Sequence, residues 1–62
     1  MTEFEKVMMD RDNMTREEAR EEREMISDEI TSAIESGASY SEIEDILLYD
    51  CGLEMDYIFD LI

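Results

Sequence analysis

The sequence predicts an all-α fold, organised as a single domain over residues 1–62, and three observations lead to this prediction. Apolar residues recur at helical spacing along most of the chain. Proline is absent, and the only two glycines, Gly37 and Gly52, stand where the helical patterns stop. No segment has the alternation of apolar and polar residues that marks a half-buried strand. We expect one long helix and two short ones, and leave open a further helical turn near the N-terminus.

The N-terminal segment, residues 3–12, carries Phe4, Val7 and Met8 at helical spacing. This spacing is compatible with a turn or two of helix. The helical turns are expected within residues 3–9, because the sequence DRDN at residues 10–13 is rich in residues that favour breaks and should interrupt the chain before Thr15.

The long helix is expected over residues 15–36. Thr15 and Glu18 have the spacing of a capping box, in which each side chain accepts a hydrogen bond from the other residue's backbone N–H. Acidic residues fill the first turn, where their negative charge interacts favourably with the positive end of the helix dipole. Gly37 suits the left-handed position just past a helix end.

The two short helices are expected over residues 39–50 and 53–61, separated by Gly52. The first begins at Ser39 or at Ser41, since both have an acid three positions later, and the spacing leaves the choice open. Their apolar positions at helical spacing are Ile43, Ile46 and Leu47 in the first helix and Leu53, Tyr57, Ile58 and Leu61 in the second.

The acids of the long helix form two rows, if each residue turns the helix by about 100°. The main acidic row lies within about 40° of its first member and consists of Glu17, Glu21, Glu24, Asp28 and Glu35. The second acidic row lies about 100 to 140° further round and consists of Glu18, Glu22 and Glu29. Apolar residues on the far side should face the core: Ala19, Ile26, Ile30, Ala33 and Ile34. Arg16, Arg20 and Arg23 flank that apolar side, so they should not neutralise the main acidic row.

The charge of the chain is its most unusual property. Nineteen acids against five bases give a net charge of −14. The imbalance is uneven, because residues 1–23 hold eight acids and all five bases (8 − 5, net −3), whereas residues 24–62 hold eleven acids and no base. A surface of one sign attracts the opposite sign. We therefore expect a basic protein as partner, and neither nucleic acid nor an anionic membrane as a direct ligand.

Several kinds of site are disfavoured by the residues present. The chain lacks histidine and has one cysteine, Cys51, so neither a structural zinc site nor an internal disulfide is expected. Asp10, Asp12 and Glu21 match the first, third and twelfth positions of a calcium loop, but Met14 and Thr15 occupy its fifth and sixth positions. We expect no metal, no cofactor and no enzymatic activity. The absence of an apolar run long enough for a membrane span and the acidic start indicate a cytoplasmic protein.

The two short helices around Gly52 have the outline of a helix-turn-helix motif. A DNA-reading version would carry basic and hydrogen-bond-donating side chains on its second helix. Here the second helix reads LEMDYIFDLI, which is acidic. The motif is therefore interpreted as two helices that close a small core.

The acidic rows are the leading candidate for a binding surface. Neighbours three or four positions apart on a helix lie about 5–6 Å apart, close to the repeat of phosphates along a nucleic-acid strand. Such rows could occupy the basic channel of a nucleic-acid-binding protein and take over its arginine and lysine contacts. Tyr40 and Tyr49 would make aromatic anchors if they point outwards. The plain alternative is a solvated helix face and half-buried tyrosines.

Two further interpretations stay open. Six methionines could line an adaptable groove for a basic amphipathic helix, which would make the chain a small adaptor or regulatory subunit, although core filling is the better explanation of the methionines. A small core also suits a homodimer or a larger homo-oligomer.

In size, charge and helical character the whole chain resembles the small, very acidic inhibitors that phages and mobile elements encode, the DNA mimics that block restriction enzymes or CRISPR effectors. The resemblance rests on no family-specific motif. It implies a non-enzymatic inhibitor, most directly an anti-CRISPR, whose target is a nucleic-acid-binding effector such as a CRISPR nuclease or a restriction enzyme. It also implies action in the cytoplasm of the host cell.

Overall fold

The computed structural model describes residues 1–62, and its regular structure is entirely helical, which confirms the all-α prediction. The elements are α1 (Glu3–Asp12), α2 (Arg16–Glu35), α3 (Tyr40–Ile46), a π-helical turn η1 (Leu47–Cys51) and a 3₁₀ helix η2 (Met55–Asp60). None of these helices combines the length and the apolar character that crossing a membrane requires.

The long helix α2 begins and ends as its local sequence predicts. The hydroxyl of Thr15 accepts a hydrogen bond from the Glu18 backbone N–H at 3.1 Å, and the Glu18 carboxylate accepts one from the Thr15 N–H at 2.8 Å. At the other end Gly37 has a φ of 86°, which only glycine adopts freely. Ala38 then donates its N–H to the carbonyl of Ala33 at 2.9 Å, closing a Schellman turn.

The N-terminal segment is a complete helix of ten residues rather than a turn or two. Its start is fixed by a second capping box, in which Thr2 and Glu5 exchange hydrogen bonds of 3.2 and 2.9 Å. Its inner face buries Phe4 and Met8 completely. Asn13, with a φ of 56°, ends the helix in the left-handed conformation that asparagine tolerates better than most residues.

The last third of the chain departs most from the prediction. Ser39 rather than Ser41 caps α3, accepting from the Glu42 N–H at 3.2 Å. The expected helix over 39–50 widens into the π-helical turn η1 after Ile46, and the expected helix over 53–61 is the shorter 3₁₀ helix η2. In an α-helix a side chain four positions on lies about 40° further round. The wider π-helical turn changes this angular offset. Leu47 and Cys51, which are four positions apart, are both buried in the core.

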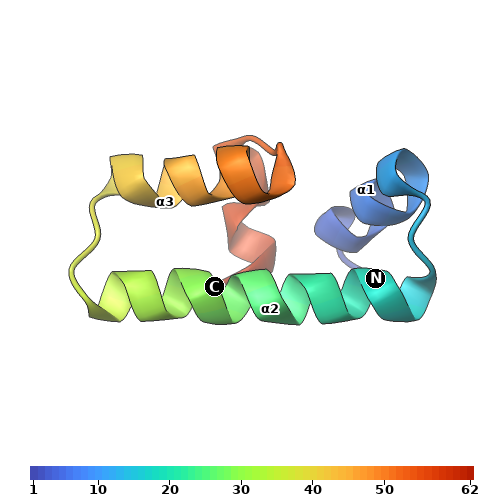
Figure 1. Cartoon of the computed structure of the whole chain (residues 1–62), viewed down its shortest axis with the longest axis horizontal. Helices are drawn as coiled ribbons and strands as arrows, with labels where there is room; N and C mark the ends of the chain where they lie inside the picture. Colours follow the sequence, from blue (N-terminus) through green and yellow to red (C-terminus); the bar gives the residue numbers. More distant parts are fainter.

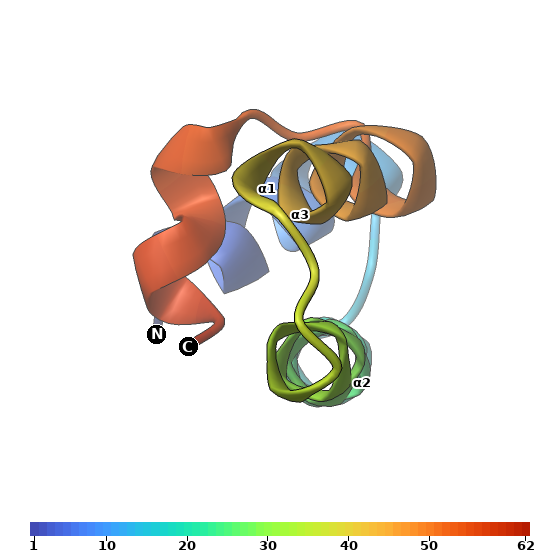
Figure 2. The ribbon, with the colours of Figure 1, turned by 90° about the vertical axis from the view of Figure 1, so that its left-hand side faces the viewer.

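The core lies between α2 and the other elements. Figure 1 shows α2 along the 33 Å length of the molecule, and Figure 2 shows it end-on with the remaining elements all to one side of it. The ten buried apolar residues are Phe4, Met8, Ala19, Ile26, Ile30, Ile43, Leu47, Cys51, Leu53 and Leu61. Because only one side of α2 is covered, the opposite side is left to solvent along its whole length.

The predicted core face of α2 was too wide. Ile34 was expected to face the core, but its side chain is 49% exposed. The buried residues of α2 occupy only about 180 to 220° of the helix circumference, measured from Glu17, whereas Ile34 lies at about 260°. Ile46 and Ile58, also expected in the core, are half-buried at its edge.

Candidate acidic interaction surface

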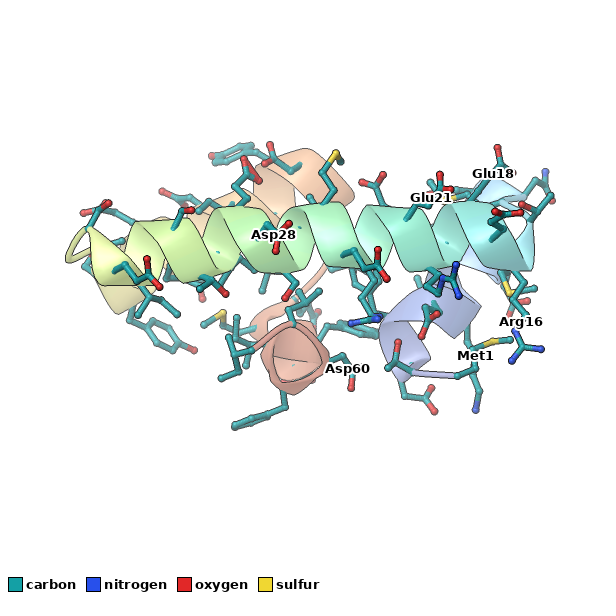
Figure 3. All side chains as sticks on the ribbon, turned by 90° about the horizontal axis from the view of Figure 1, so that it is seen from below. Met1, Arg16, Glu18, Glu21, Asp28 and Asp60 are labelled. Atoms are coloured by element: carbon teal, nitrogen blue, oxygen red, sulfur yellow. The ribbon has the colours of Figure 1, made fainter.

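The main acidic row runs along the uncovered side of α2. All five of its members, Glu17, Glu21, Glu24, Asp28 and Glu35, are exposed. Figure 3 views the molecule from this side, with Asp28 over the middle of the helix. The ion pairs of the molecule are Lys6 with Glu3, Arg11 with Asp12, and Arg23 with Glu5, so none involves this row. Its negative charge is therefore uncompensated by any close contact.

The five bases are held at the N-terminal end of the molecule. Arg16 and Arg20 share a shallow hollow with Met1, Glu5 and Glu17. Arg16 and Met1 lie together at that end in Figure 3. Beyond Arg23 the sequence of α2 contains no base, so the members of the main row without a base beside them in the chain are Asp28 and Glu35.

Arg23 has a structural partner in α1. The Arg23 Nε lies 3.6 Å from a carboxylate oxygen of Glu5, and both side chains are largely buried. Hydrogen bonds from Thr2 and the nearby Arg23 guanidinium hold the pKa of Glu5 below its usual value. Arg23 thus joins α2 to α1 on the flank of the apolar face, away from the main acidic row.

The second acidic row is less uniform than the sequence suggests. Glu18 is occupied as the capping residue of α2, and its hydrogen bonds with Thr15 lower its pKa. Glu29 instead faces η1, where a hydrogen bond with the Asp50 carboxyl raises the pKa of Glu29, helped by partial burial and by the charge of Asp50. The two residues lie on different elements, so the spacing along one helix could not indicate that they meet.

A shallow hollow forms where the second acidic row meets η1. Its lining consists of Glu22, Met25, Ile26, Glu29, Tyr49 and Asp50. Tyr49 is 79% exposed there, with the exposed Met25 on the other wall. Tyr40 is also exposed, but at the start of α3, and it lines none of the hollows. The structure therefore brings one of the two predicted tyrosine anchors to the acidic surface.

The chemistry available at this surface is electrostatic. No three acidic or cysteine side chains converge closely enough to hold a metal ion. Cys51 is buried, and desolvation together with the charges of Glu22, Asp50 and Glu29 raises its pKa to about 11, so it is a thiol at neutral pH. A protonated, buried thiol is a poor nucleophile.

The fold and this surface define a small all-α acidic protein with one long, uncompensated helix face. Comparison with protein-family models, with curated proteins and with solved structures gives no match. The charge, shape and burial of the surface are therefore the grounds on which a function can be assigned.

Proposed function

We propose that this protein is a non-enzymatic inhibitor of a nucleic-acid-binding defence protein, most directly an anti-CRISPR that acts as an acidic mimic of nucleic acid. It would act in the cytoplasm of the host cell. The observation that carries the proposal is the main acidic row, which is exposed from end to end on the free side of α2 and has no ion-pair partner.

The linear charge density of α2 supports mimicry. The two acidic rows hold eight acids between Glu17 and Glu35, a distance of about 27 Å at about 1.5 Å per residue. This gives one acid for about every 3.4 Å of helix, which equals the axial spacing of phosphates along one strand of B-DNA. Arg20 and Arg23 lie in the same stretch and reduce its net charge to −6 (8 − 2), or one negative charge for about every 4.5 Å of helix. A channel that binds a strand through arginine and lysine would therefore meet a lower but comparable density of negative charge.

The cost of the row to folding also supports a role in binding. Like charges four positions apart on a helix are destabilising by about 0.2–0.5 kcal/mol per pair. The main row contains two such pairs, Glu17 with Glu21 and Glu24 with Asp28, in a domain whose core has ten buried apolar residues. Small cores leave little stability to spare. A basic partner would convert this repulsion into binding energy.

An order-of-addition assay tests the proposal. A guide-loaded CRISPR nuclease and a restriction enzyme are each mixed with the protein before, or after, their DNA substrate, and cleavage is followed over time. Occupation of the nucleic-acid channel predicts strong inhibition when the protein is added first and weak inhibition when DNA is bound first. It also predicts that inhibition falls steeply as salt is raised, because exposed charges are screened over about 10 Å at 0.1 M. Inhibition that depends neither on the order of addition nor on the salt concentration would contradict mimicry.

A second candidate is an adaptor that binds a basic amphipathic helix of a partner. Eight large apolar side chains are exposed, among them Met25, Leu48 and Phe59, which is more than a purely electrostatic surface needs. An adaptor predicts binding that depends weakly on salt and strongly on these apolar residues. Truncation of Met25 or Phe59 that weakens binding more than loss of the main acidic row would favour this function.

A further inference from the structure

A third hollow lies at the end of α3 and contains no residue of α2. It measures about 400 Å³ and opens between the last turn of α3, η1 and the segment leading into η2. Its lining residues are Glu44, Leu48, Leu53, Glu54, Met55 and Asp56, and most of the wall that solvent can reach is apolar. It shares no residue with α2, and the elements that form it lie across the molecule from α2 in both ribbon views (Figures 1 and 2).

The chain reversal at Gly52 builds this hollow. Gly52 adopts a φ of 64°, and the following Leu53 donates its N–H to the carbonyl of Leu47 at 3.1 Å. The reversal turns residues 53–56 back against the side of the helix that carries Glu44 and Leu48. Arg11 holds the reversal in place, since its guanidinium donates to the carbonyl oxygens of Cys51 and Gly52 at 2.6 and 3.1 Å. The hollow is therefore tied to α1 by hydrogen bonds.

The floor and the rim of the hollow differ in chemistry. Leu53 is buried in the floor, whereas Leu48 remains 52% exposed beside it, so part of the apolar wall is open to solvent. The rim carries three exposed carboxylates, Glu44, Glu54 and Asp56, and none takes part in an ion pair. An apolar side chain in the hollow would cover Leu48, and bases on either side of that side chain would meet the rim acids.

Charge decides which kind of partner fits. A second copy of this chain would bring another −14 to the contact, so that acids would face acids around an apolar centre. Like charges placed against each other across an interface cost several kcal/mol. A basic segment gains from the same arrangement, both by neutralising the rim and by shielding Leu48.

We propose that this hollow docks a basic amphipathic segment of a partner protein, with one large apolar side chain against Leu48 and Leu53 and with lysine or arginine on the rim acids. This inference rests on the second candidate function, the adaptor, and gives it a binding site. It is separate from inhibition by the main acidic row, because the two surfaces share no residue and can be removed separately. A partner that engaged both would be held on two faces of the molecule.

Labelled peptides of about 15 residues, long enough for four helical turns, test the hollow by fluorescence anisotropy. One peptide carries leucine and tryptophan flanked by lysine and arginine, a second replaces its apolar residues by serine, and a third replaces its bases by glutamate. The first should bind the wild-type protein, and the other two should bind at least about tenfold more weakly, a difference of about 1.4 kcal/mol.

The matched variants are Leu48→Asp and Ile34→Asp, since each adds one charge and removes one aliphatic side chain that is about half exposed. Leu48→Asp should weaken binding of the first peptide about tenfold or more, whereas Ile34→Asp, at a position outside the hollow, should change it less than about twofold. The double variant Glu44→Lys, Glu54→Lys should also bind the first peptide more weakly, and its circular dichroism spectrum should remain that of a helical protein. Equal binding by wild type and both hollow variants, or equal binding of the serine peptide, would overturn the proposal. The proposal would also be overturned if sedimentation showed that the wild-type protein is a dimer and that Leu48→Asp is a monomer, since the occupant of the hollow would then be a second copy of the chain.

Discussion

The guanidinium of Arg11 donates a hydrogen bond to the carbonyl oxygen of Cys51 at 2.6 Å, across 40 positions of the chain. Carbonyls at a helix end lack partners within the helix and carry its negative partial charge, so a guanidinium is a strong match for them. A second bond, to Gly52 at 3.1 Å, completes a fork that ties α1 to the end of η1. This contact fixes the last third of the chain against the first.

Replacement of Arg11 by glutamine should therefore destabilise the fold. Hydrogen bonds to charged groups contribute about 1.5–3 kcal/mol each when well formed, but half-exposed ones contribute less, so we expect a loss of about 1–2 kcal/mol in the free energy of unfolding. Urea denaturation followed by circular dichroism measures it. Arg20→Gln removes the same charge from a side chain with no hydrogen-bond partner and should change stability by less than about 0.5 kcal/mol. Equal losses in the two variants would mean that net charge, not the fork, matters.

Truncation of the two adjacent leucines of η1 should change the stability of the fold by very different amounts. Leu47 is fully buried and Leu48 is 52% exposed. Leu47→Ala should cost about 2–5 kcal/mol, which is comparable to the whole stability of a domain of this size, so the variant should be largely unfolded at 25 °C. Leu48→Ala should stay folded with a change below about 1 kcal/mol. Thermal unfolding monitored at a helical wavelength compares the two variants, and similar unfolding of both would contradict the burial of Leu47 and the exposure of Leu48.

Cys51 should react slowly in the folded protein. Burial and the surrounding acids raise its pKa to about 11, so the reactive thiolate is scarce at pH 8. Iodoacetamide should modify the folded protein far more slowly than the protein in guanidinium chloride, and the folded rate should keep rising up to about pH 11. Mass spectrometry of the alkylated chain gives both rates. Rapid modification of the folded protein at pH 8 would show that the thiol is exposed.

The carboxyl pair of Glu29 and Asp50 should make Glu29→Gln more stable than wild type at pH 7. Because the pair raises the pKa of Glu29, folding favours its protonated form, and the stability linked to that proton is present at low pH and lost as pH rises through the raised pKa. Glutamine keeps the neutral form at every pH. The gain should therefore shrink as the pH approaches 4. Three other acids have lowered pKa values, so the stability linked to them is lost as the pH falls: Glu5, Asp12 and Glu18. Their contribution is the same in both proteins and does not affect the comparison.

Glu24→Gln is the matched control for this titration, since it neutralises an exposed acid of α2 outside the pair. Its gain at pH 7 should be smaller, because it relieves only repulsion between solvated charges. Urea midpoints measured from pH 4 to 8 for the three proteins decide the matter. Identical dependence of the urea midpoint on pH for Glu29→Gln and Glu24→Gln would show that Glu29 and Asp50 are not specifically coupled.

Local sequence patterns predicted the parts of the structure that depend on neighbours in the chain. The Thr15 cap, the left-handed Gly37 and the exposed main acidic row each follow from residues within a few positions of one another. The main row needs only the helical period and one apolar face. These features are local, so the sequence contains all the information about them.

The remaining features depend on which segments meet in space. The π-helical turn, the Arg11 fork and the pairing of Glu29 with Asp50 each join elements whose relative placement no spacing encodes. Thr2 and Glu5 have the spacing of a capping box, a local pattern that indicates a helix start at the N-terminus. The acidic-rimmed hollow likewise appears only when the chain reverses at Gly52.

The most direct test of the proposed mimicry is reversal of the main acidic row in the order-of-addition cleavage assay. Glu21, Glu24 and Asp28 are changed together to lysine, and a control changes Asp10, Glu42 and Asp45, three exposed acids outside α2, in the same way. Both variants shift the net charge from −14 to −8, since each substitution adds two positive charges (−14 + 6). With both variants helical by circular dichroism, mimicry predicts that the control still inhibits and that the α2 variant does not. Full inhibition by the α2 variant would contradict it.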